Sequence, residues 1–122
     1  MQEQQKAFID LTLKEYSAKT GYPVPKVELM PILITICGVT PAGYDPKSKT
    51  IFISEDFIRE RWATVYGRDV IRSILAEEFW HSVQDAKGEI PDIYVHYEPI
   101  ILMLEKEARQ KAVELSGISV YG

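Results

Sequence analysis

The distribution of proline is the feature of this 122-residue sequence that most restricts its fold. Proline lacks a backbone N–H and locks φ, so it is excluded from helix interiors and is common in extended segments and turns. It recurs at short intervals in one region, at Pro23, Pro25, Pro31, Pro41 and Pro46. We therefore expect extended segments and turns over residues 23–49, with helices before and after this region.

Four helices are predicted outside the proline-rich region. Apolar residues at helical spacing, together with capping and glycine signals, place them at residues 2–18, 55–66, 70–86 and 98–115. Ser54 is expected to cap the second helix, and Gly67 to end it. Asp69 is the expected N-cap of the third helix.

Two short runs rich in Ile and Thr predict strands at residues 32–36 and 50–53. Turn residues over 38–49 leave these strands close enough for a hairpin-like pairing. A chain of 122 residues suits one domain by size. The sequence therefore predicts an α+β fold, a small sheet packed against about four helices, in a single domain over residues 1–122.

The cysteine and histidine counts limit the kinds of metal site that this chain can build. It has one cysteine, Cys37, and two histidines, His81 and His96. A lone cysteine excludes an internal disulfide, a thiolate zinc site and an iron–sulfur cluster. Any metal must therefore be held by histidine and carboxylate groups.

The net charge and the hydropathy of the sequence indicate which binding partners and which cellular compartment to expect. A net charge of −4 gives no general attraction to phosphate backbones, so no nucleic-acid partner is expected. The N-terminus lacks the pattern of a secretory signal, and the longest mainly apolar stretch, 27–39, falls short of the roughly 20 residues of a membrane helix. We expect a cytoplasmic protein without a membrane partner.

Acidic residues fall on faces of two predicted helices that should be buried. At 100° per residue, Glu78 lies in the apolar stripe of the helix at 70–86, with His81 at its margin and Glu77 slightly beyond. In the helix at 98–115, Glu105 falls in the inner sector, whereas Glu107 points about 100° away and is expected to be solvated. Because an isolated buried carboxylate is costly, these residues predict a metal or acid/base site between two helices.

Glu77 and Glu78 also have structural alternatives. Glu77 also suits a solvated acid on the rim of its helix, and Glu78 suits a carboxylate paired with an arginine or a backbone donor. Glu78 and His81 also form a Glu-x-x-His unit of the kind found in di-iron bundles. Ile93 stands where a second unit ending at His96 would need its glutamate, so a dinuclear site is not expected.

Residues 76–84, Ala-Glu-Glu-Phe-Trp-His-Ser-Val-Gln, resemble the active-site helix of zincin metallopeptidases, whose motif is His-Glu-x-x-His. The segment that begins at Glu105 is similar to the glutamate-bearing helix of gluzincins, and the resemblance extends over residues 27–112. The similarity is closest to minimal, single-domain gluzincins. It implies a zincin-like fold, zinc or another divalent metal as cofactor, and a peptide or protein substrate.

The resemblance also implies roles for individual residues. Glu78 takes the position of the catalytic general base, and His81 and Glu105 take the positions of the second and third metal ligands. Glu77 replaces the first histidine, although its carboxylate can still act as a ligand one helical turn from His81. A more anionic site makes the metal a weaker Lewis acid, so the resemblance implies a peptidase with reduced or lost activity.

Two further expectations follow from the same similarity. His96, Tyr94 and Tyr97 lie just before the last predicted helix and are candidates for contact with a reacting oxyanion or with substrate. Their alternative is a loop of solvated polar groups. For the protein as a whole, the alternative to a peptidase is a non-catalytic peptide-binding or regulatory protein of the zincin fold without bound metal.

Overall fold

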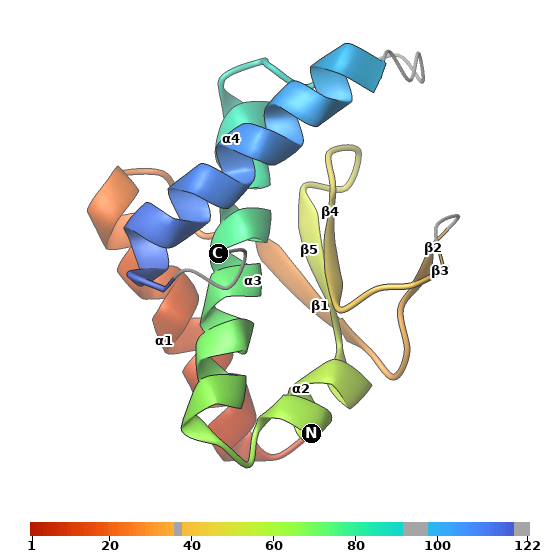
Figure 1. The fold of residues 1–122 in the computed structure, drawn as a ribbon, viewed down its shortest axis with the longest axis vertical. Coiled ribbons are helices and arrows are strands. Elements are labelled where there is room, and N and C mark those ends of the chain that lie inside the picture. Colours follow the sequence, from red (N-terminus) through yellow and green to blue (C-terminus); the bar gives the residue numbers. More distant parts are fainter. Residues whose placement is uncertain (36–37, 92–97, 119–122) are drawn as a thin grey trace.

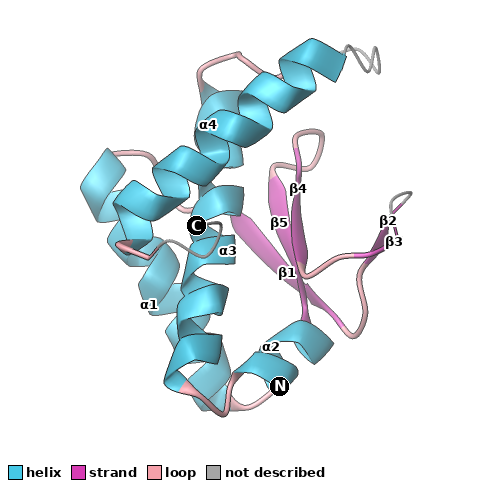
Figure 2. Ribbon diagram, viewed as in Figure 1, coloured by secondary structure: helices cyan, strands magenta, loops and turns pink. Residues whose placement is uncertain are grey.

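A computed structural model describes residues 1–35, 38–91 and 98–118 of the chain (Figure 1). Its helices are α1 (Glu3–Thr20), α2 (Glu55–Arg61), α3 (Val65–Ala86) and α4 (Glu98–Ser116). Its strands are β1 (Lys26–Met30), β2 (Ile34–Thr35), β3 (Gly38–Val39), β4 (Ala42–Asp45) and β5 (Thr50–Ser54). The predicted α+β class, with four helices and a small sheet in the described residues, is confirmed (Figure 2).

The main sheet has the strand order β1-β5-β4, with β5 in the centre. β1 runs parallel to β5, whereas β4 pairs antiparallel with it, so that Ala42 lies opposite Ile53 and Asp45 opposite Thr50. Ile51 and Ile53 are both buried, as expected of a strand with neighbours on both sides. β2 and β3 form a separate two-stranded sheet.

The predicted partner of residues 50–53 is wrong. We expected the strand at 32–36 to pair with them, but of this segment only Ile34–Thr35 is a described strand, and it pairs with β3. β4 instead follows the turn-rich segment back along β5, and β1 lies before Pro31. β1 alternates polar and apolar residues, a local strand pattern that the prediction missed. β4 contains residues typical of turns and forms a strand through its pairing with β5.

The boundary between the second and third helices also differs from the prediction. Gly67 does not end α2 but lies inside the first turn of α3, and Thr64, rather than Asp69, is the N-cap. The Thr64 hydroxyl accepts a hydrogen bond from the Gly67 N–H at 2.9 Å. The expected cap at Ser54 is confirmed, because its hydroxyl accepts from the Phe57 N–H at 3.2 Å.

Helix α3 is the centre of the molecule and packs against α1, α2, α4 and β4 (Figure 1). Phe79 faces α1, where its ring lies 6.1 Å from that of Tyr16. Ala108 and Ala112 are fully buried on α4, and such small side chains allow close approach of two helices. None of the helices in the described ranges is long and apolar enough to cross a membrane.

Replacing Gly67 with alanine should destabilise the protein by about 2 kcal/mol or more, because the added Cβ would overlap the carbonyl oxygen of Arg61. Chemical denaturation monitored by circular dichroism measures the change. Gly43→Ala is the matched control, since a Cβ there meets no atom within 4 Å. Equal stability of the two variants would contradict the tight connection between α2 and α3.

Candidate functional site

A cleft of about 510 Å³ lies between α3, α4 and the strand β4. Residues 40–44 form one wall, Ile101 and Leu104 contribute from α4, and Ile74 belongs to α3. Among the described residues, the acidic and basic side chains that line the cleft are Glu77, Glu78, His81 and Glu105. The structure therefore brings together four of the residues that the sequence predicted for a site.

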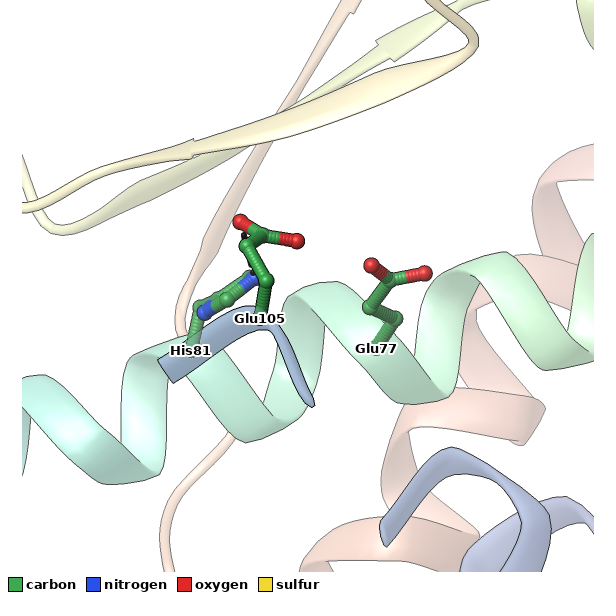
Figure 3. Close-up of side chains that lie close together, drawn as sticks. All are labelled: Glu77, His81 and Glu105. Carbon is green, nitrogen blue, oxygen red and sulfur yellow. Dashed lines mark ion pairs between the residues drawn. The ribbon is translucent and has the colours of Figure 1, made fainter. Parts of the chain in front are cut away.

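Glu77, His81 and Glu105 form a compact group in this cleft (Figure 3). Glu77 and His81 are one helical turn apart and project from the same side of α3, while Glu105 reaches them from α4. One potential ligand atom from each residue lies within 4.8 Å of the others. The group can therefore hold a metal ion.

The donor set fits a divalent transition metal. It offers one imidazole nitrogen and two carboxylate oxygens, which suit zinc and its first-row neighbours. Donors that share one Zn²⁺ at about 2.0–2.1 Å lie about 3–4 Å apart. Side-chain rotations that move the three atoms by on the order of 1 Å would bring them into that range.

Gln84 orients the imidazole of His81. The Gln84 amide nitrogen donates to the Leu104 carbonyl at 2.9 Å and to Glu107 at 3.2 Å, so the amide oxygen is the acceptor that faces His81. That oxygen lies 2.8 Å from His81 Nδ1. In neutral His81 the proton therefore resides on Nδ1, and Nε2 keeps a free lone pair for a ligand.

Glu77 is buried, with 7% of its surface exposed, so the alternative of a solvated acid on the helix rim is wrong. Its carboxylate lies 3.8 Å from the Arg109 Nε. The projection placed Glu77 outside the apolar stripe because it assumed one buried face. In fact α3 packs against α1, α2, α4 and β4, and α4 reaches Glu77 through Arg109.

Glu78 lines the cleft beside this group and is half-buried. Burial raises the pKa of its carboxyl to about 7; the neighbouring His81 opposes that rise, and the charges of Glu77 and Glu105 add to it. A carboxyl that titrates near neutral pH is suited to accept and return a proton.

His81 and Glu105 form an ion pair, with 3.2 Å between His81 Nε2 and a Glu105 oxygen. Burial alone would lower the pKa of His81, but the hydrogen bond to Glu105 and the charges of Glu78 and Glu105 raise it to about 9. The same hydrogen bond holds the pKa of Glu105 below its usual range. Without a metal, His81 is therefore cationic at neutral pH.

Glu105, and not Glu107, is the acid of α4 that joins the site. Glu107 was expected to be solvated, but it is half-buried and accepts a hydrogen bond from the Trp80 indole at 2.6 Å. That hydrogen bond is the main reason why the pKa of Glu107 is lowered. Glu107 thus ties α4 to α3 without facing the ligand group.

Three of the predicted site residues, His96, Tyr94 and Tyr97, lie outside the described part of the chain, as does Cys37. Two residues that contact the ligand group were not predicted. Gln84 and Arg109 were missed, although each follows a predicted ligand by one helical turn and so shares its helix face. That spacing was the sequence signal from which both residues could have been predicted.

No protein-family model, curated protein or solved structure matches this chain. The resemblance to zincins therefore stays a prediction carried by the residues themselves.

The free energy of unfolding of the metal-free protein should fall by a few kcal/mol between pH 5 and pH 9. Glu78 and His81 both have pKa values raised by folding, so the folded state binds more protons than the unfolded chain in this range. Their contribution is complete at low pH and is lost as pH rises through about 7 for Glu78 and about 9 for His81.

Urea denaturation at pH 5, 7 and 9 measures this effect. Glu78→Gln should flatten the lower half of the profile, and His81→Gln the upper half. A wild-type stability that is constant or rises from pH 5 to pH 9 would contradict the assigned pKa values.

Proposed function

We propose that this protein is a metal-dependent peptide hydrolase of the gluzincin type in which a glutamate replaces the first histidine ligand. The observation that carries the proposal is the convergence of Glu77, His81 and Glu105 in one cleft, next to a fourth residue, Glu78, with a pKa of about 7. This is the set of positions that the resemblance assigns to three ligands and a general base.

The wall of the cleft favours an extended peptide as the ligand. β4 pairs only with β5 among the described strands, so one of its edges has backbone groups without a strand partner. An extended peptide can add to such an edge through main-chain hydrogen bonds. Its backbone would then cross the cleft in front of Glu78 and His81.

The residues of the chain supply distinct parts of the chemistry. A bound divalent metal would polarise the peptide carbonyl and a water molecule. Glu78 accepts a proton from the water as its oxygen bonds to the carbonyl carbon, then delivers the proton to the amide nitrogen as the C–N bond breaks. Gln84 keeps Nε2 of His81 directed toward the metal position.

A second candidate function is peptide binding without metal or catalysis. The observation that favours it is the ion pairing of the ligand group, in which His81 pairs with Glu105 and Arg109 with Glu77. These pairs compensate both acids without a metal ion. In this case the cleft and the edge of β4 would bind an extended peptide, and Glu78 would have no catalytic role.

Tag-free protein should bind one Zn²⁺ per chain, as measured by isothermal titration calorimetry and elemental analysis. His81→Ala and Glu105→Ala each remove a ligand and should weaken binding by roughly a hundredfold or more. Glu114→Gln is the matched control, because it removes an exposed acid from the same helix, away from the ligand group. Binding that is absent in the folded wild type, or unchanged in both ligand variants, would contradict the metal site.

Zinc-loaded protein should cleave members of a quenched fluorescent peptide library, and mass spectrometry would locate the broken bond. Glu78→Gln should lower kcat by at least about a hundredfold while it leaves peptide affinity within a few fold. Glu77→His should raise kcat by restoring a second imidazole. Peptide binding without turnover in both the wild type and Glu77→His would support the second candidate instead.

A further inference from the structure

The ligand group belongs to a larger arrangement of four charged side chains. On α3, Glu77 precedes His81 by four residues, and on α4, Glu105 precedes Arg109 by the same interval. The acid of each helix faces the base of the other, at 3.2 Å for His81 and Glu105 and 3.8 Å for Arg109 and Glu77. This pattern of contacts indicates that the two helices run antiparallel at the site.

Arg109 brings a permanent positive charge to this arrangement, since a guanidinium does not lose its proton in proteins. Its Nε lies 3.8 Å from the carboxylate of Glu77, one of the three residues of the ligand group. A divalent cation held by the ligand group would therefore lie close to this charge.

We propose that Arg109 is a positioning residue that sets the metal affinity of this site, by acting as an internal cation that competes with the metal for Glu77. The proposal rests on the metal site proposed above and concerns its regulation. The Arg109 side chain is 55% exposed, so it has room to move into solvent when a metal takes the Glu77 carboxylate. In the metal-free state Arg109 compensates the buried charge of Glu77. In the metal-bound state the positive charge of Arg109 repels the metal ion.

Two opposite effects of removing the charge follow from this role. Without Arg109, the buried carboxylate of Glu77 loses a compensating charge, so the metal-free protein becomes less stable. The same change removes a repulsion of one charge against a divalent ion roughly 6 Å away, which is worth about tenfold in affinity in a medium like water. A purely structural side chain would produce only the first effect.

The test is Zn²⁺ binding by isothermal titration calorimetry to tag-free wild-type, Arg109→Gln and Arg109→Lys protein. A second neutral variant, Arg109→Met, guards against a fold defect specific to glutamine, and circular dichroism checks the fold of each protein. Lys106→Gln is the matched control, because it removes one positive charge from an exposed position on the same helix. Thermal unfolding of the same metal-free proteins gives the second readout.

The expected result is a Kd for Zn²⁺ about tenfold lower in the two neutral variants, with Arg109→Lys and Lys106→Gln within about threefold of the wild type. The melting temperature of the metal-free neutral variants should fall at the same time. Wild-type binding with unchanged or weaker affinity in both neutral variants would overturn the role of Arg109 and leave the metal site standing. Absence of binding in every folded protein would overturn both.

Discussion

The enclosure of α3 by other elements is the constraint on which the rest of this structure depends. One face of the helix packs on α1 through Phe79, a second meets α4 through Trp80 and Gln84, and a third borders the cleft at Glu78. A helix covered in this way has little free surface for charged groups, so each acid on it needs a partner. The ligand group lies where the second and third faces meet.

The sequence was sufficient to predict four helices, apart from the boundary between α2 and α3, but not how the strands pair. α1 and α4 end within two residues of the predicted positions, because Gly21 and Gly117, both with positive φ, are local stop signals. β4 could not be predicted in this way, since its residues are typical of turns and become a strand only through pairing with β5. Gly67 misled the prediction for a related reason, because a tight contact rather than a helix end requires glycine there.

The features of the candidate site also divide into those that local sequence predicts and those that depend on how the helices pack. Helical periodicity was enough to predict that Glu78, His81 and Glu105 lie near the interior, whereas the role of Glu77 was implied only by the resemblance to zincins. The structure places all four side chains in one cleft. Which acid of α3 is more deeply buried was not readable, because it depends on where α4 crosses. The contribution of Arg109 required the same knowledge of the crossing.

The acid-then-base order shared by α3 and α4, which run antiparallel at the site, also affects how the two helices align. Sliding α4 by one turn in one direction would place Glu105 opposite Glu77, and in the other direction Arg109 opposite His81. Each shifted alignment would break both of these acid–base contacts, which is unfavourable in a partly buried site. The residues that line the cleft therefore also favour the helical register that builds it.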